Sequence, residues 1–140
     1  MEKRKFAVVD IESAGGLDNP LSYDIGFKII DNTKKEYSAL SLVIYDIYKQ
    51  KDLMNSAYYA DKLPKYEIKL KSGERKMVTF RTAKFTISEL MKKYNVTDVY
   101  AYNMNFDRRG LNNTQSFLTE GQFKYFFPYG TKFHCIWNMA

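Results

Sequence analysis

Residues 6–16 read FAVVDIESAGG, and this stretch decides the class of fold. It opens with an apolar run, Lys5–Ile11, that predicts a strand of nearly continuous apolar character, as expected where both faces are covered. Two acids, Asp10 and Glu12, interrupt the run with one isoleucine between them, and two glycines follow. Because side chains alternate along a strand, both acids should point to the same face. The stretch therefore predicts a buried strand that ends in paired carboxylates.

The rest of the chain predicts an α/β layered domain. Leu21–Ile30 and Glu36–Ile44 are rich in β-formers and should complete an antiparallel three-stranded meander. Helices should then alternate with parallel strands, which gives a mixed sheet flanked by helices. The elements expected after the meander are a helix at 45–61 ended by Pro64, a hairpin at 66–80, a helix at 86–94 begun by a Thr86–Glu89 capping box, a strand at 98–102, a helix at 107–118 weakened by Gly110, and a strand at 132–137.

Length and composition predict a single domain spanning residues 1–140. Basic residues number 22 and acidic residues 16, and the resulting net charge of +6 favours polyanionic partners. No apolar run approaches the roughly 18 residues that a membrane span needs, and no signal-peptide core follows Met1. Cys135 is the only cysteine, which excludes an intrachain disulfide and a cysteine zinc site. We expect a cytoplasmic protein with no membrane partner.

Asp10 and Glu12 predict a metal site at the end of the first strand. Two carboxylates a few ångströms apart repel each other, and in a partly buried place one of them would keep its proton. A divalent cation removes this conflict and prefers hard oxygen ligands of this kind. Strand ends in open α/β sheets are also where ligands usually bind. The alternative is an exposed strand end with two solvated acids.

A second stretch, residues 99–107, reads VYAYNMNFD and adds a third acid. A short apolar strand is followed by Asn103 and then by Phe106-Asp107, at a place where a strand should pass into a helix. Asp107 is either a cap of the helix N-terminus or a third carboxylate that meets the first two at the same sheet edge. Asn103 is either a turn residue or a polar contact to a substrate.

Together the two stretches resemble the motifs of the DEDD (DnaQ-like) exonucleases, proofreading-type 3′-to-5′ nucleases with a ribonuclease-H-like fold. The first motif of that family is an apolar strand ending in D-x-E, here Asp10-Ile11-Glu12. The second is N-x-x-F-D, here residues 103–107, and the Ile25-Gly26 pair is similar to the family's second strand. The resemblance covers residues 5–138, and the tyrosine-rich style of the chain is similar to that of phage proteins.

This resemblance implies that Asp10, Glu12 and Asp107 are catalytic and hold two Mg²⁺ or Mn²⁺ ions. One ion would activate a water and the other would stabilise the leaving 3′ oxygen. The implied substrate is single-stranded DNA or a DNA 3′ end. Phe106 would wedge against a base, although a place in the core suits it equally. The implied substrate contacts, several of them through the backbone, are Ser13, Ala14, Gly15, Asn103 and Phe106.

The family's third motif, a His or Tyr general base followed four or five residues later by Asp, is missing from the sequence. His134 is the only histidine, the residue five positions later is Met139, and Asp107 is the last aspartate. We therefore expect His134 to be a strand residue. The apolar end, with Ile136 and Trp137, suggests a truncation of a fold whose missing part carries a helix, the general base and the fourth carboxylate. Such an exposed end could also pair with a second subunit in a homodimer.

Three functions follow from these patterns. The first is a metal-dependent 3′-to-5′ exonuclease domain acting on DNA, weak or inactive as this chain. The second is a non-catalytic module on the same scaffold that binds nucleic acid or protein, such as a phage regulator or inhibitor inside a bacterial host. The third is a structural protein whose acids only cap strands and helices.

Overall fold

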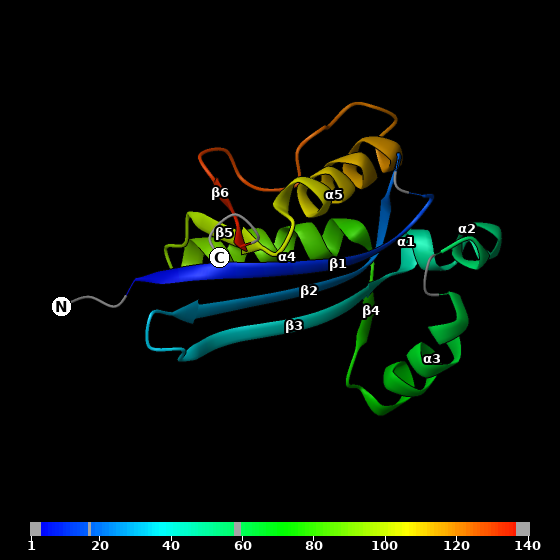
Figure 1. The fold of residues 1–140 in the computed structure, drawn as a ribbon, viewed down its shortest axis with the longest axis horizontal. Coiled ribbons are helices and arrows are strands. Elements are labelled where there is room, and N and C mark those ends of the chain that lie inside the picture. Colours follow the sequence, from blue (N-terminus) through cyan, green and yellow to red (C-terminus); the bar gives the residue numbers. More distant parts are fainter. Residues whose placement is uncertain (1–3, 17, 58–59, 137–140) are drawn as a thin grey trace.

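The computed structural model describes residues 4–16, 18–57 and 60–136, which form a six-stranded mixed sheet (Figure 1). The strand order is β4-β3-β2-β1-β5-β6. The first three strands pair in antiparallel fashion, and β4, β5 and β6 pair parallel to their neighbours. The expected meander followed by parallel strands is confirmed. The strands are β1 Lys5–Ala14, β2 Leu21–Asp31, β3 Glu36–Ile44, β4 Lys76–Val78, β5 Asp98–Ala101 and β6 Lys132–Cys135.

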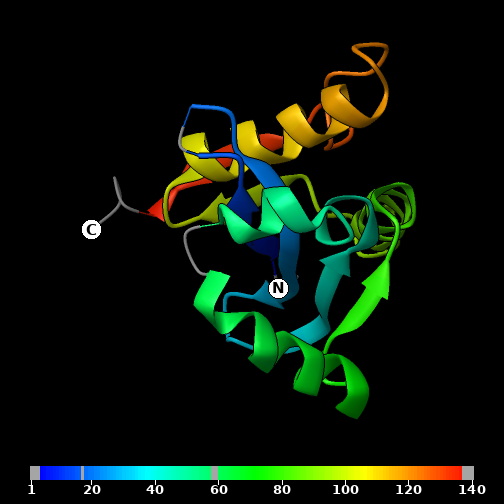
Figure 2. The ribbon, with the colours of Figure 1, turned by 90° about the vertical axis from the view of Figure 1, so that its right-hand side faces the viewer.

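Helices lie on both faces of this sheet. Figures 1 and 2 show α4 and α5 on one face and α3 beyond the other face, near the end where β1 finishes. In the described part of the chain, no helix combines the length and apolar character needed to cross a membrane. The helices are α1 Tyr45–Tyr48, α2 Lys51–Asn55, α3 Leu63–Ser72, α4 Phe80–Lys93 and α5 Met104–Leu118, with a short 3-10 helix η1 at Ala60–Lys62.

The core lies between the sheet and the pair α4 and α5. Along β1, Ala7, Val9 and Ile11 are buried, whereas Val8 is half-buried and Asp10 is exposed. This clear alternation corrects the expectation of a strand covered on both faces. Its physical reason is that, among the described residues, α3 is the helix on the second face and lies only near one end of the sheet.

The expected hairpin at 66–80 is wrong, because the structure has helix α3 there and only the short strand β4 after it. Pro64 stands in the first turn of α3, where its missing N–H group costs no hydrogen bond. Gly73 ends the helix with a φ of 83°, a left-handed conformation that glycine adopts without strain. Pro64 therefore begins a helix rather than ending one, and the alternation of Tyr66 and Ile68 belongs to a helix with Tyr66 buried and Ile68 exposed.

Two further helix predictions need correction. The expected helix at 45–61 is divided into α1, α2 and η1, because Gln50 takes an extended conformation between the first two. Asp46 on α1 instead accepts a hydrogen bond from the backbone N of Phe80 at 2.6 Å, a tertiary contact that ties α1 to the start of α4. Helix α4 begins at Phe80, and its cap is Thr79, whose hydroxyl accepts from the N of Thr82. The expected capping box lies inside the helix.

Candidate carboxylate site

The acids of β1 lie on the open face of the sheet, next to a third carboxylate from β2. Asp10 and Glu12 point away from the core, and Glu12 pairs with Asp24 across the antiparallel ladder. Directly paired residues point to the same face, so Asp24 joins the two acids there. A register shift follows Glu12 at the next step of the ladder. Two carboxylates of β1 and one of β2 therefore lie next to each other on this face.

Asp107 reaches the same place from α5. Its side chain is 5% exposed, and its Oδ1 accepts a hydrogen bond of 3.1 Å from the backbone N of Ile11. Strand β5 pairs with β1 only as far as Val8 opposite Tyr100, so the carboxylate takes the place that a strand partner would have for Ile11. Asp107 thus contacts β1 at Ile11, the residue between Asp10 and Glu12 in the sequence.

The helix-cap interpretation of Asp107 does not describe this contact. Helix α5 begins at Met104, three residues earlier than expected, so Asp107 lies at the end of the first turn. The side chain of the N-cap residue, Asn103, makes no capping hydrogen bond. The carboxylate is directed to β1 instead.

Gly110 lets α5 approach β1 closely enough for this bond. A Cβ atom at Gly110 would overlap the Cδ1 atom of Ile11. One turn later, the Thr114 hydroxyl accepts from the backbone N of Ser22 at 2.8 Å and donates to the carbonyl of Gly110 at 2.7 Å. The glycine that was expected to weaken the helix is therefore the residue that brings Asp107 within reach of the strand.

We expect Gly110→Ala to lower the free energy of unfolding by roughly 1 kcal/mol. Overpacking against Ile11 costs about 1–3 kcal/mol, and the better helix propensity of alanine returns about 1 kcal/mol. In an Ile11→Val background the overlapping methyl is absent, so the same substitution should become neutral or stabilising. Urea unfolding of the four proteins measures this coupling as a double-mutant cycle. Additive effects would contradict the proposed contact.

Crowding of the carboxylates shifts their ionisation. Burial, together with repulsion from Asp10 and Glu12, raises the pKa of Asp107 to about 7, although the hydrogen bond from Ile11 acts in the opposite direction. The pKa of Glu12 is raised by partial desolvation and then by Asp10 and Asp24. Although Asp10 remains open to solvent, its pKa is also raised, first by desolvation and then by Asp24. The site therefore resists full ionisation, and a bound cation would favour the ionised forms.

Asp24 is held by two residues that the sequence did not single out. It is 4% exposed, its Oδ2 accepts from the hydroxyl of Tyr66 at 2.6 Å, and both of its oxygens accept from Nη1 of Arg75 at 2.6 and 2.7 Å. Desolvation raises the pKa of Asp24, and the Tyr66 hydroxyl and the Arg75 guanidinium oppose that shift. An acid inside an apolar strand is a signal for such a partner, but the sequence does not say which residue supplies it.

The expected substrate contacts after β1 have local structural roles. Ser13 is half-buried, and the side chain of Ala14 is buried, so Ala14 can offer a ligand only its backbone. Gly15 has a φ of 88°, and a Cβ there would lie 2.8 Å from the carbonyl oxygen of Asn19. Gly15 is therefore required by the turn itself, whatever lies outside it.

The expected contacts near Asp107 divide between solvent and core. Asn103 is exposed at the start of α5, and its carbonyl accepts from the N atoms of Phe106 and Asp107 at 3.1 and 3.2 Å. Its side chain makes no capping bond. Phe106 is half-buried and packs against the core, which agrees with the second of the two roles considered for it.

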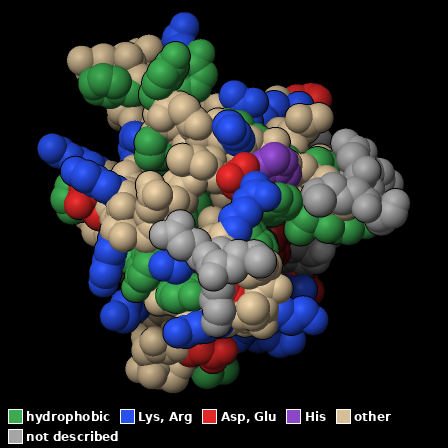
Figure 3. Space-filling view, turned by 90° about the vertical axis from the view of Figure 1, so that its left-hand side faces the viewer, with side chains coloured by type: hydrophobic (Ala, Val, Ile, Leu, Met, Phe, Trp, Pro, Cys, Tyr) green, Lys and Arg blue, Asp and Glu red, His purple; other side chains and the backbone are tan. Residues whose placement is uncertain are grey.

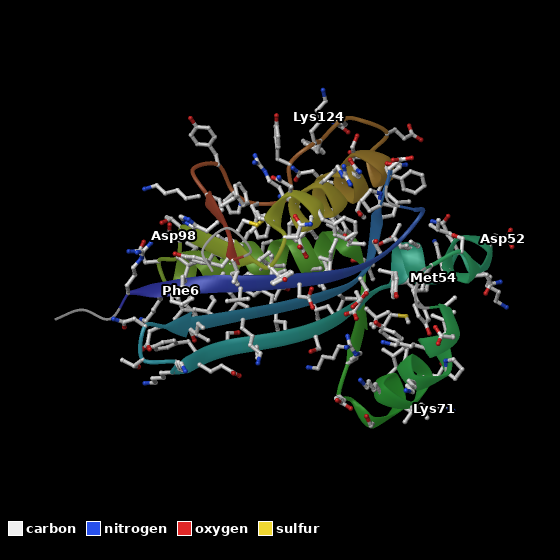
Figure 4. The ribbon with its side chains drawn as sticks, in the orientation of Figure 1. Phe6, Asp52, Met54, Lys71, Asp98 and Lys124 are labelled. Atoms are coloured by element: carbon white, nitrogen blue, oxygen red, sulfur yellow. The ribbon has the colours of Figure 1, made fainter. Side chains whose placement is uncertain are left out.

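His134 lies in β6, as expected of a strand residue. Its Nε2 lies 2.7 Å from Oδ1 of Asp98, its ring stacks on Tyr100 at 4.5 Å, and Arg4 completes the cluster 3.1 Å from Asp98. Figure 3 shows the histidine beside acidic and basic side chains, and Figure 4 places Asp98 and Phe6 near the N-terminal end of β1. His134 thus contributes to the pairing of β5 with β6. Trp137 and Met139 lie outside the described residues.

Comparisons with known proteins add no family. The chain matches no protein-family model and no curated protein. Within residues 4–16, 18–57 and 60–136, no group of three or more His, Cys, Asp or Glu side chains is already arranged to hold a metal ion. The functional argument therefore starts from the contacts of the carboxylate site itself, which is the set Asp10, Glu12, Asp24 and Asp107.

Proposed function

We propose that this chain is a metal-dependent nuclease domain that hydrolyses phosphodiester bonds at single-stranded DNA 3′ ends. Asp10, Glu12 and Asp107 would hold Mg²⁺ or Mn²⁺. One observation carries the proposal: the hydrogen bond from the N of Ile11 to Oδ1 of Asp107, which joins two motifs 96 residues apart in sequence. An antiparallel meander followed by parallel strands also agrees with the ribonuclease-H-like fold that the motifs imply.

The donor set suits a hard divalent cation. All of the acids offer carboxylate oxygens, which Mg²⁺ and Mn²⁺ prefer. The bond from Ile11 uses Oδ1 of Asp107, and a cation would bind through Oδ2. The pKa values of Asp10, Glu12 and Asp107 are raised because desolvation and mutual repulsion disfavour their ionised forms when no cation is bound. When bound, such ions would activate a water and stabilise the leaving oxygen of the phosphodiester.

The chain's own carboxylates would bind the cation and orient it toward the substrate. Asp107 is fixed by Ile11 and by the close packing of Gly110, so it offers a rigid ligand. Asp10 lies on the open face of the sheet, where a substrate can approach. Glu12 is half-buried and lies next to a cavity that α3 also lines. The arrangement combines one fixed carboxylate with two that remain accessible.

A non-catalytic module is the second candidate. His134 is the chain's only histidine, and it is engaged by Asp98 and stacked on Tyr100. The sequence has no other histidine to act as a general base beside the carboxylates. We therefore expect weak cleavage by this chain at best, and metal binding is the sharper first test.

The test measures Mn²⁺ affinity by titration calorimetry. We expect Asp107→Asn and Glu12→Gln each to weaken Mn²⁺ binding about tenfold or more, a loss of about 1.4 kcal/mol or more. Asp52→Asn, an exposed acid on α2 (Figure 4), is the matched control and should bind Mn²⁺ like the wild type. Equal affinities in all four proteins would overturn the proposal.

Cleavage is a separate readout. A 5′-labelled single-stranded oligonucleotide is incubated with Mn²⁺ and the wild type or Asp10→Asn. Stepwise shortening from the 3′ end by the wild type alone supports the nuclease. Mn²⁺ bound at these carboxylates with no shortening, even at protein excess, supports the non-catalytic module instead.

A further inference from the structure

A small cationic cavity opens beside Glu12, between that residue and α3. Its volume is about 160 Å³, enough for several water molecules or a phosphate group. One acid and four cations line it, so its charge is opposite to that of the neighbouring carboxylates. The lining residues are Glu12, Lys62, Lys65, Tyr66, Lys69 and Arg75.

Three of these cations form a row along one side of α3 and of the end of η1 that precedes it. Lys62, Lys65 and Lys69 are separated by three and four residues, a spacing that places side chains on the same side of a helix. At 1.5 Å per residue the row extends over about 10 Å. We call Lys62, Lys65 and Lys69 the lysine row.

The contact of Tyr66 with Asp24 fixes the side of α3 that faces the carboxylate site, and the lysine row lies on that side. Tyr66 is the buried residue of α3, and its hydroxyl donates to Oδ2 of Asp24. Its ring packs edge-on against Tyr23 at 5.8 Å. Lys65 and Lys69 flank Tyr66 along the helix, so the contact that anchors α3 to the sheet also directs these ammonium groups into the cavity beside Glu12.

Lys65 and Lys69 can supply positive charge to a ligand. Arg75 is already engaged by Asp24, but in the described part of the chain neither Lys65 nor Lys69 forms an ion pair. Holding like charges along one helix face is unfavourable. Glu12 attracts Lys62 and Asp24 attracts Lys69, but the cations that line the cavity outnumber its one acid. A bound anion would add counter-charge.

We propose that the lysine row binds phosphates of a single nucleic-acid strand whose 3′ end lies at the carboxylate site, an inference that rests on the proposed function. A single carboxylate or phosphate ion would contact only part of a row of about 10 Å, whereas a chain of linked phosphates can contact all of it. Lysine acts as a point charge, so these contacts position the strand without reading its bases. The lysines thus bind next to the reacting end rather than at it.

The test is the salt dependence of oligonucleotide binding, measured by fluorescence anisotropy with a labelled dT12 strand in EDTA. We expect Lys65→Gln/Lys69→Gln to weaken binding about tenfold and to reduce the slope of log K against log salt by about 1.4, the value for two lost phosphate contacts on a single strand. The control Lys71→Gln/Lys92→Gln removes the same charge from exposed sites outside the cavity, and Figure 4 shows Lys71 near the end of α3.

Equal losses in the two double variants would overturn the inference, because general charge would then explain binding. Thermal unfolding of both variants shows whether each is folded. Mn²⁺ titration of the wild type separates failure of the lysine-row inference from failure of the proposed nuclease function. Mn²⁺ binding with equal losses in the two variants defeats only the lysine row. A selective loss in the cavity variant without Mn²⁺ binding retains a phosphate-binding row and defeats the nuclease.

Discussion

Arg75→Ala should lower the free energy of unfolding by about 3–5 kcal/mol, because it leaves a buried carboxylate without its cation. Asp24 is 4% exposed and accepts two hydrogen bonds from one nitrogen of Arg75. With that cation removed, Asp24 would keep the hydrogen bond from the Tyr66 hydroxyl and a weaker electrostatic attraction to Lys69. Urea unfolding at pH 7 measures the loss.

Two further proteins make this prediction specific. Lys28 and Glu36 form an exposed ion pair at 3.7 Å, and Lys28→Ala should cost less than about 1 kcal/mol. Asp24→Asn/Arg75→Gln removes both charges and should recover a large part of the loss, since no unpaired charge stays buried. If Arg75→Ala costs no more than Lys28→Ala, the Asp24–Arg75 pair does not hold α3 and β4 to the sheet as described.

The antiparallel half of the sheet could be predicted because its pattern is local. Along β1, the order of apolar and polar residues alone states that Val9 and Ile11 face one way and that Asp10 and Glu12 face the other. The sequence pattern does not show how much of each face of the sheet is covered by helices. That depends on where α3 packs, and α3 itself was misjudged.

The error at α3 has a physical cause. Short apolar runs fit a strand or a helix about equally well, and periodicity alone does not separate them. Pro64 fits the end of one helix, but proline is equally common in the first turn of the next. Gly73 fits a hairpin turn, but it equally ends a helix. Both residues marked the boundaries of a helix, and reading them together would have identified α3.

The site was predicted in part for a similar reason. That Asp10 and Glu12 share a face follows from alternation, but the approach of Asp107 depends on Gly110, whose missing side chain was read as a defect. Asp24 could not be assigned a role, because its partner Arg75 lies 51 residues later in the sequence. Contacts of this kind depend on tertiary packing, which a single sequence does not reveal.

Asp107→Asn should raise the free energy of unfolding at pH 8 by about 2–4 kcal/mol when no metal is present, by linkage of folding to ionisation. The ordinary pKa of this carboxyl is 3.8, and in the folded protein it is about 7. Between these values the folded state binds more protons than the unfolded state, so wild-type stability falls as pH rises. Below pH 3.8 the cost is absent, and above pH 7 it is present in full. Asparagine carries no charge, and its Oδ1 can still accept from Ile11.

The measurement is urea unfolding of both proteins at pH 4, 6 and 8 in EDTA. The difference in stability should be small at pH 4 and should grow to its full value at pH 8. Asp52→Asn, the exposed control on α2, should follow the wild type throughout. A constant difference between Asp107→Asn and the wild type at all three pH values would show that burial of this charge is not the cause.

Mn²⁺ should narrow the difference in stability between the two proteins. A ligand that binds only the folded state stabilises it by about 2.7 kcal/mol at a concentration of 100 times its Kd. The wild type would gain this stabilisation at pH 8, where the cation favours the ionised form of Asp107. The variant lacks that carboxylate and would gain far less. The same substitution is therefore expected to stabilise the metal-free protein and to remove the stabilisation by Mn²⁺, a combination that a purely structural role for Asp107 does not produce.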